Sequence, residues 1–238
     1  MPAADSALVT GGTGALGRAV VARFLADGMS VAVTYVVEKE WQALSDAEGE
    51  ASRSGRLQGF RAELTDEEAV RGAVEAAAKS FGGVRVLAHL AGGYAGGADV
   101  EQVEAKAARQ MIDMNLLTAI LAAKHVIPHA KRSGAGRLVF ISSRGAIECY
   151  PGASAYAAAK AGLLALTVTL SKELKESGVT ANAVLPSVID TAANRASMPR
   201  ADYAAWVKPA EIAGLLSYLA SRAAQAVTGA LIPIYGRA

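Results

Sequence analysis

Three closely spaced glycines separate the first apolar segment of the chain from a helical one. Residues 7–10 are short and apolar, which is typical of a buried strand. The pattern Gly12-x-Gly14-x-x-Gly17 follows directly, and the amphipathic residues 19–26 predict a helix that Gly28 ends. Glycines in such a turn let the backbone approach a pyrophosphate, which the helix amino terminus then faces. This strand–turn–helix unit is therefore expected to bind a dinucleotide.

Strand-like and helical segments alternate along the rest of the chain. The predicted strands cover residues 7–10, 30–34, 57–62, 84–90, 137–141, 179–185 and 230–234. The predicted helices cover residues 19–26, 38–48, 63–80, 101–113, 114–130, 154–176 and 209–222. This alternation predicts a mostly parallel, doubly wound α/β sheet, a three-layer α/β/α Rossmann fold that binds ligands at the carboxyl ends of its strands. We expect a single domain over residues 1–238.

Composition excludes several classes of protein. The net charge is +2, from 24 basic and 22 acidic residues, which makes no case for nucleic acid or membrane binding. Cys149 is the single cysteine, so no intramolecular disulfide is expected, and no metal site is predicted. The chain has no run of 18 apolar residues and no signal-peptide core. We therefore expect a cytoplasmic enzyme without a membrane span.

A hydroxyl, a phenol and an amine are expected to meet at the end of the fifth strand. Ser143 follows that strand, and Tyr156 and Lys160 lie four residues apart on one face of the next helix. A phenol that exchanges a proton near neutral pH needs its anion stabilised, which a lysine and a helix amino terminus can do. Ser143 could hold a carbonyl oxygen against the phenol. The three residues would supply an acid, the group that tunes it and an orienting donor.

The second and third strands are expected to end near the adenosine of the dinucleotide. An acid after the second strand selects NAD, whereas a basic neighbour accommodates the additional phosphate of NADP. Tyr35 is neither, and Glu38 is expected to begin the next helix. The cofactor is therefore NAD or NADP, with the preference open. Glu63, after the third strand, either lies near the adenine or caps the chain end.

Two features suggest a ligand beside the fourth strand. Residues 91–97 contain four glycines, which indicates either a backbone close to a ligand or a flexible loop. Asn115 lies inside an apolar helix, where an amide is costly unless its hydrogen bonds are satisfied. It is either a structural hydrogen-bonding residue or the holder of an active-site water.

Residues 187–208 lack a regular apolar period, although they contain Met198, Tyr203 and Trp206. We expect a loop-rich lid that closes over substrate and nicotinamide. Tyr94, on the glycine-rich loop, would supply the facing wall, and such a site suits a flat or ring-shaped small molecule. The alternative is that these side chains pack on the final helix.

Taken together, residues 10–17, Asn115, Ser143, 156–160 and 182–186 resemble the short-chain dehydrogenase/reductase family over nearly the whole chain. The resemblance implies that Tyr156 is the general acid/base and that Lys160 lowers its pKa and binds the nicotinamide ribose. It also implies that Ser143 holds the substrate carbonyl and that Asn115 holds a water of the proton relay. The implied cofactor contacts are Gly11, Gly12, Thr13, Gly14, Ala15, Leu16, Gly17, Tyr35, Glu63, Leu64, Ala91, Gly92, Gly93, Tyr156, Lys160, Pro186, Ser187, Ile189 and Thr191.

The chain departs from the family pattern at several positions. Ala15 and Ser187 stand where the family has glycines, and His89-Leu90 replaces two asparagines that brace the central strand. We expect a neutral His89 to brace that strand instead. Segments 14–17, 36–38, 91–97 and 185–206 are similar to those of quinonoid dihydropteridine reductase.

The expected function is hydride transfer between a nicotinamide cofactor and a carbonyl or alcohol substrate. A dihydropteridine-type reductase is one alternative, and a nucleotide-binding regulatory protein without turnover is the other. Residues 114–130 and 155–171 are apolar on more than one helix face, so we expect a homodimer or homotetramer that pairs these helices.

Overall fold

The computed structural model describes residues 5–237. Its seven strands form one parallel sheet in the order β3-β2-β1-β4-β5-β6-β7. The strands are β1 (Ser6–Thr10), β2 (Ser30–Tyr35), β3 (Leu57–Arg61), β4 (Val86–His89), β5 (Arg137–Ile141), β6 (Thr180–Pro186) and β7 (Leu231–Ile234). The strand order reverses between β1 and β4, so their carboxyl ends border the crevice where such sheets bind ligands. The predicted doubly wound α/β fold is confirmed.

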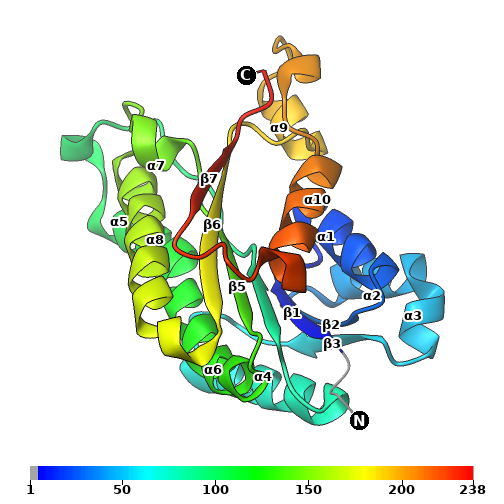
Figure 1. Cartoon of the computed structure of the whole chain (residues 1–238). Coiled ribbons are helices and arrows are strands. Elements are labelled where there is room, and N and C mark those ends of the chain that lie inside the picture. Colours follow the sequence, from blue (N-terminus) through cyan, green and yellow to red (C-terminus); the bar gives the residue numbers. More distant parts are fainter. Residues whose placement is uncertain (1–4, 238) are drawn as a thin grey trace.

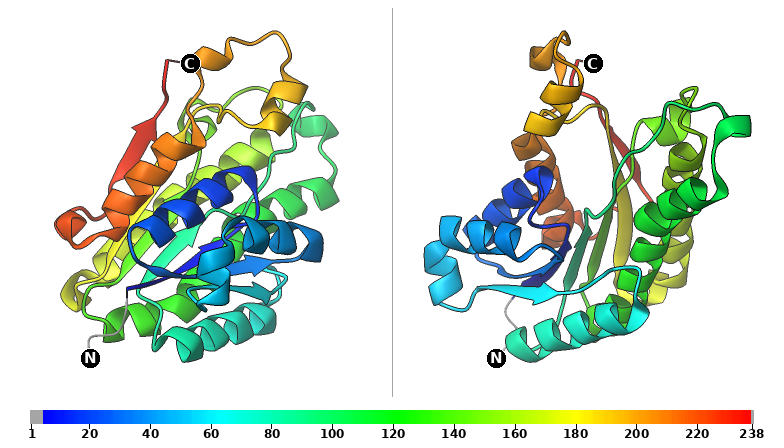
Figure 2. Two further views of the ribbon diagram at one scale, coloured as in Figure 1. Left: turned by 90° about the vertical axis from the view of Figure 1, so that its right-hand side faces the viewer. Right: turned by 180° about the vertical axis from the view of Figure 1, so that it is seen from behind.

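Helices cover both faces of the sheet (Figures 1 and 2). One face carries α1 (Ala15–Ala26), α2 (Glu38–Ala47), α3 (Gly49–Arg53) and α10 (Pro209–Ala220). The other face carries α4 (Glu67–Phe81), α6 (Thr118–Arg132) and α8 (Ser154–Glu173), and α5 (Ala105–Ile112) packs against α8. Two short helices, α7 (Gly145–Glu148) and α9 (Ala192–Ser197), follow β5 and β6.

Each face of the sheet has its own apolar core. Alternate strand residues point to opposite faces, so Val9 and Val139 join the cluster under α1 and α10, whereas Leu8 and Phe140 join the cluster under α4, α6 and α8. All four side chains are buried, as expected for parallel strands covered on both sides.

Three predicted helix boundaries were wrong, each for a local reason. Helix α1 begins at Ala15, because Gly14 is extended and acts as the N-cap. Helix α4 begins only after Asp66, whose Oδ1 accepts hydrogen bonds from the amides of Glu68 and Ala69. The helices expected over residues 101–113 and 114–130 begin only at Ala105, and a π-helical turn over Asp113–Leu117 joins α5 to α6 where the two were expected to meet.

Helix α8 begins at Ser154, as predicted. The Ser142 hydroxyl donates a hydrogen bond of 2.9 Å to the Lys160 carbonyl, which fixes the first turns of this helix against the end of β5. The segment after β6 is mostly irregular, with α9 and a 3₁₀ turn at Tyr203–Ala205.

Two helical stretches, Ala105–Arg132 and Ser154–Glu173, are long and apolar enough to cross a membrane by length and composition alone. Core helices of soluble proteins meet the same criterion, and both stretches here pack against the sheet. Part of their apolar surface nevertheless remains exposed, including Ile112 and Ile120.

Candidate active site

The glycine-rich turn between β1 and α1 contains two kinds of glycine. Gly11 has a φ of +68°, and a Cβ there would lie 2.9 Å from the amide nitrogen of Ala91. A Cβ on Gly17 would lie 2.2 Å from the Gly11 carbonyl oxygen, so α1 can pack this closely only without one. Gly14 is different, because its nearest neighbour would be 3.4 Å away and the residue is exposed. Packing within the chain therefore does not require a glycine at position 14, and this residue lines a groove on the surface.

A groove of about 1000 Å³ runs along the carboxyl ends of β1, β2, β3 and β4. Twelve of the predicted cofactor residues line it: Gly11, Thr13, Gly14, Ala15, Leu16, Gly17, Tyr35, Glu63, Leu64, Ala91, Gly92 and Thr191. Twelve further residues that were not predicted also line it: Thr34, Val36, Glu40, Ala62, Thr65, Leu90, Lys106, Arg109, Gln110, Asp113, Met114 and Thr118. Several of these directly flank predicted residues in the sequence, which is the signal that could have identified them.

The remaining predicted cofactor residues do not line this groove. Gly12 is buried under Val33, which leaves no space for a Cβ. The carbonyl of Pro186 accepts a hydrogen bond from the Arg144 amide, and the Ser187 hydroxyl donates one to the Tyr235 carbonyl at 2.7 Å. Glu63 both lines the groove and caps its own turn, since its Oε1 accepts from the Thr65 amide and hydroxyl.

Ser143, Tyr156 and Lys160 come together where β5 meets α8. The Ser143 hydroxyl lies beside the Tyr156 phenol, where it favours the ionised form of the phenol and so lowers its pKa. The Lys160 ammonium lies 6.0 Å from the centre of the Tyr156 ring and donates a hydrogen bond of 2.9 Å to the Ile141 carbonyl. A Cβ on Gly92 would lie 3.2 Å from this ammonium, so the glycine-rich loop after β4 closes over the lysine.

Burial shifts the proton equilibria of both ionisable groups. The pKa of Lys160 falls to about 8, because its buried surroundings disfavour the charged form. Burial raises the pKa of Tyr156, the Ser143 hydroxyl partly offsets this effect, and the nearby Tyr94 adds to it. The phenol is therefore protonated at neutral pH, which is the state that a proton donor requires.

Asn115 lies within the π-helical turn between α5 and α6. Its amide nitrogen donates to the carbonyls of Gly93 and Met111, both at 3.0 Å, and its Oδ1 accepts from the Gly93 amide at 3.1 Å. The buried amide is thus satisfied by main-chain groups and holds the loop after β4 against this turn. Single π turns inside helices frequently occur at functional sites.

Tyr94 borders the phenol on the solvent side. Its ring meets the Tyr156 ring edge to face, with centroids 5.0 Å apart, while 67% of the residue is exposed. An exposed aromatic ring beside the phenol is available to contact a bound molecule, and the role of Tyr94 as the wall facing the lid stays a prediction.

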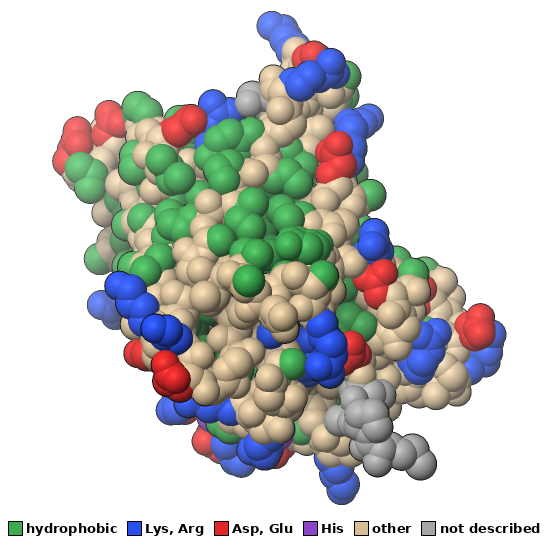
Figure 3. Space-filling model, viewed as in Figure 1, with side chains coloured by type: hydrophobic (Ala, Val, Ile, Leu, Met, Phe, Trp, Pro, Cys, Tyr) green, Lys and Arg blue, Asp and Glu red, His purple; other side chains and the backbone are tan. Residues whose placement is uncertain are grey.

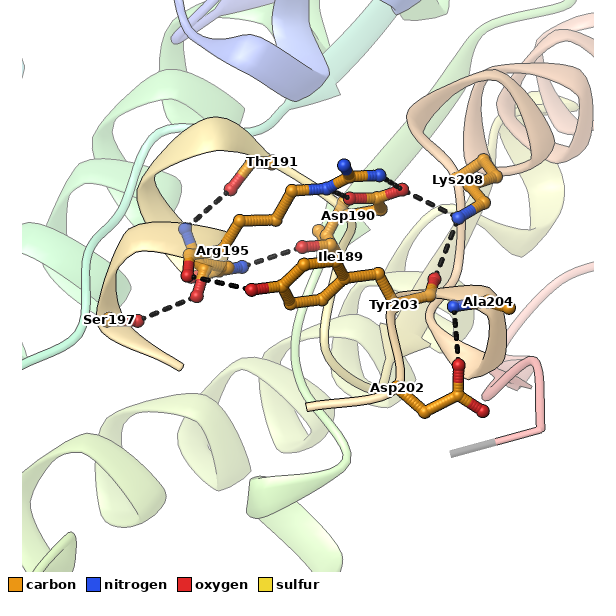
Figure 4. A network of polar contacts seen from close by, with 10 residues as sticks. Ile189, Asp190, Thr191, Arg195, Ser197, Asp202, Tyr203, Ala204 and Lys208 are labelled. Carbon is orange, nitrogen blue, oxygen red and sulfur yellow. Dashed lines mark hydrogen bonds and ion pairs between the residues drawn. The ribbon is translucent and has the colours of Figure 1, made fainter. Parts of the chain in front are cut away.

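The predicted lid is held together by its own contacts (Figure 4). Asp190 accepts hydrogen bonds from Arg195 Nε at 2.5 Å and from Lys208 Nζ at 2.6 Å, and only 8% of its side chain is exposed. The Tyr203 ring lies under the Arg195 guanidinium and against Trp206, which is buried. Tyr203 and Trp206 therefore pack against lid residues, while Met198 is exposed.

Comparison with known proteins identifies the family. Residues 5–202 match the family described as short chain dehydrogenase. The chain belongs to the short-chain dehydrogenase family. It is 34% identical to the 3-oxoacyl-acyl-carrier-protein reductase MabA of Mycobacterium tuberculosis, covering 97% of this chain and 91% of that protein. It is 33% identical to the cis-4-hydroxycyclohexanecarboxylate dehydrogenase of Sinomonas cyclohexanicum, covering 97% and 94%.

A solved structure agrees with this assignment. The blue fluorescent protein from a metagenomic library, in complex with NADPH, superposes with a TM-score of 0.89 at 30% identity, over 99% of this chain and 98% of that chain. The protein is thus an NAD(P)-dependent short-chain dehydrogenase. The suggested likeness to dihydropteridine reductase is not supported, since the relatives that align over nearly the whole chain include 3-oxoacyl-acyl-carrier-protein reductases and a hydroxycyclohexanecarboxylate dehydrogenase.

The groove of this short-chain dehydrogenase fits a dinucleotide on its own geometry. The Gly11 and Gly17 backbones approach their neighbours more closely than any side chain allows, and Gly14 and Ala15 bring the amino terminus of α1 to the groove wall. Backbone amides and a helix amino terminus are the groups that bind a pyrophosphate.

His89, where the family has an asparagine, braces the strand ends of this dehydrogenase. The Thr118 hydroxyl donates to the Met114 carbonyl, so at 3.3 Å from His89 Nε2 it must accept a hydrogen bond from that nitrogen. Thr10 accepts from the Leu90 amide and donates to His89 Nδ1 at 2.9 Å. Burial and the Lys160 charge lower the pKa of His89 to about 3. The expected neutral, bracing His89 is therefore found, with its proton on Nε2.

Proposed function

We propose that this short-chain dehydrogenase interconverts a carbonyl compound and an alcohol by a mechanism that uses Ser143, Tyr156 and Lys160. The observation that carries the proposal is that the Tyr156 ring lies beside Ser143 with its centre 6.0 Å from the Lys160 ammonium. This ammonium lies next to Gly92, which lines the groove. This is an acid–base site without a nucleophile, which suits proton transfer coupled to reduction.

The bound nicotinamide would supply or accept the hydride. Ser143 would hold the substrate oxygen beside the Tyr156 phenol by donating a hydrogen bond to it. The protonated phenol would give its proton to that oxygen during reduction. Lys160 would stabilise the resulting phenolate by its positive charge, and its low pKa keeps it close to the point at which it exchanges protons. Asn115 would support this arrangement by fixing the loop after β4, and its suggested role in holding a relay water remains a prediction.

For the substrate, we propose a 3-oxoacyl thioester, the class named in several relatives that align with nearly the whole chain. A ring-shaped alcohol or ketone is the second candidate. It is favoured by the exposed Tyr94 ring beside Tyr156 and by the relative named for a hydroxycyclohexane substrate. In both cases Met198 would contact the substrate when the segment 187–208 closes, whereas Tyr203 and Trp206 would act by holding that segment in shape.

The test measures oxidation of NADH and NADPH with three acceptors: acetoacetyl-coenzyme A, 4-oxocyclohexanecarboxylate and quinonoid dihydropterin. The proposal predicts turnover with one of the first two, and loss of that turnover in Ser143→Ala. Turnover confined to the dihydropterin would overturn the substrate proposal. Turnover that is unchanged in Ser143→Ala would overturn the mechanism.

We further propose a homodimer or homotetramer in the cytoplasm. Apolar side chains gather on the face that carries β7 and α8 (Figure 3), and β7 is an edge strand whose Leu231 is exposed. Apolar residues on α5 and α6, such as Ile112 and Ile120, are also exposed, so the helices predicted to form the interface carry apolar surface as well. A monomer in light scattering at micromolar concentration would contradict the assembly.

A further inference from the structure

A carboxylate lies at the end of the groove that β2 and α2 form, although no acid directly follows β2. That place is taken by Tyr35 and Val36. Glu40, in the first turn of α2, lines the groove together with these two residues. Its Oε2 accepts a hydrogen bond of 3.0 Å from the hydroxyl of Thr13, which belongs to the glycine-rich turn and also lines the groove. Glu40 thus links the two segments that should border the adenosine ribose.

The first turn of α2 is fixed against the glycine-rich turn by a second set of contacts. Arg18 donates from Nε to the Thr13 carbonyl at 3.0 Å and from Nη2 to the Glu40 carbonyl at 3.2 Å. The Trp41 ring stacks on the Tyr35 ring, with centroids 5.6 Å apart and planes 13° apart. Glu40 therefore extends from a braced helix start, which keeps its carboxylate at the groove.

Within the residues that the structure describes, no cationic side chain from this wall lines the groove. The cations that line the groove are Lys106 and Arg109, which come from α5 on the other side of the sheet. Arg18 does not line the groove, and two of its donors are already bound to main-chain carbonyls. Arg61, near Tyr35, does not line the groove either.

We propose that Glu40 determines cofactor specificity and makes this enzyme prefer NAD(H) to NADP(H). The 2′-hydroxyl of an adenosine ribose can donate a hydrogen bond to a carboxylate, whereas a 2′-phosphate in the same place is repelled by it. Thr13 positions the carboxylate by donating a hydrogen bond to Oε2 of Glu40. The inference rests on the groove being the cofactor site of the proposed function, and it distinguishes this chain from the relative whose structure contains NADPH.

Equilibrium binding tests the proposal without any substrate. The change in fluorescence of NADH and NADPH on binding gives a dissociation constant for each cofactor at fixed ionic strength. We expect the wild-type protein to bind NADH at least about tenfold more tightly than NADPH, the scale of one unfavourable charge contact. Glu40→Gln should bring the two dissociation constants close together, chiefly by tightening NADPH binding. Glu40→Lys should make NADPH the more tightly bound cofactor.

Two further variants separate a local effect from a general change of charge. Glu50→Gln, on α3 and outside the groove lining, makes the same change in net charge and should leave the ratio unaltered. Thr13→Val should weaken NADH binding without improving NADPH binding, because the carboxylate stays but loses its positioning donor. In the wild-type protein, raising the salt concentration should reduce the ratio, because salt screens the repulsion.

NADPH binding that equals or exceeds NADH binding in the wild type would overturn the proposal, as would an unchanged ratio in Glu40→Gln. Failure to bind either cofactor would be a different result. It would overturn the cofactor groove itself and the proposed function with it.

Discussion

The ammonium of Lys160 donates a hydrogen bond of 2.9 Å to the main-chain carbonyl of Ile141, the last residue of β5. The contact places a charged side chain in a buried position, with a neutral acceptor as its hydrogen-bond partner. Burying a charge in this way is costly, and such groups with strongly shifted pKa values cluster at functional sites. The cost at Lys160 is therefore expected to serve the chemistry rather than the stability of the fold.

Lys160 should make stability depend on alkaline pH. Its pKa is 10.5 in its ordinary state and about 8 in the folded protein, so between these values the unfolded chain binds more protons than the folded one. The neutral amine therefore favours the folded state. Its contribution to the free energy of unfolding, on the order of 3 kcal/mol, is fully present above about pH 10.5 and is lost as the pH falls through about 8.

Urea unfolding of the wild type and of Lys160→Met at pH 7 and pH 10 measures this contribution, because the variant removes the titrating group and leaves the others. The unfolding free energy of the wild type minus that of Lys160→Met should be larger at pH 10 than at pH 7. A difference that is the same at both pH values would contradict the shifted pKa.

Two glycines of the same turn should respond differently to one methyl group. Gly17→Ala places a Cβ 2.2 Å from the Gly11 carbonyl, a backbone atom that cannot move without shifting β1 from α1, so we expect loss of folding. Gly14→Ala meets nothing closer than 3.4 Å and should fold normally. Because Gly14 lines the groove, this variant should nevertheless bind cofactor more weakly. Circular dichroism and cofactor titration of both variants measure the two effects, and equal thermal stabilities would refute the steric account.

The His89 ring should remain neutral over the whole physiological range. Its pKa of about 3 predicts that the ring nitrogen shifts in NMR stay constant between pH 5 and 8, with the proton on Nε2. Substitution by leucine would leave the hydroxyls of Thr10 and Thr118 without this partner, at a cost on the order of 3 kcal/mol. His89→Asn, the residue common in the family, should cost less. Titration of this ring near pH 6 would exclude the bracing role.

The Asp190 contacts should keep the segment 187–208 closed to proteases. Asp190→Asn removes the charge that holds both Arg195 and Lys208, so trypsin should cleave after Arg195 severalfold faster. Asp46→Asn, on the exposed surface of α2, serves as the control. If bound cofactor and substrate analogue protect the wild type more than cofactor alone, the segment acts as a lid. Equal cleavage of wild type and Asp190→Asn would show that this pair does not order it.

The features that the sequence reasoning predicted correctly depend on local pattern. Apolar strand segments and the helix beginning at Ser154 follow from residues close together in the chain, and so does the shared helix face of Tyr156 and Lys160. The predictions that were missed depend on contacts between distant segments. Glu40 reaches Thr13 across 27 positions, and no local pattern distinguishes it from Glu38.

The same limit applies to the helix that contains Asn115. The apolar pattern of residues 101–130 is helical throughout, and the π turn is placed where the Asn115 side chain binds both the amide and the carbonyl of Gly93. Trp206 is a further case, since the sequence predicts that it covers the substrate or packs on the final helix, whereas it is buried and its ring packs against Tyr203.

The central claim is that the Tyr156 phenol transfers the proton, and Tyr156→Phe tests it most directly. The variant keeps the ring against Tyr94 and loses only the hydroxyl, so cofactor dissociation constants should be unchanged. Turnover of the best acceptor should fall by at least about 10²-fold, the usual contribution of a positioned acid. Tyr218→Phe, on the exposed face of α10, should retain full activity. If Tyr156→Phe turns over that substrate at nearly the wild-type rate, the mechanism is wrong.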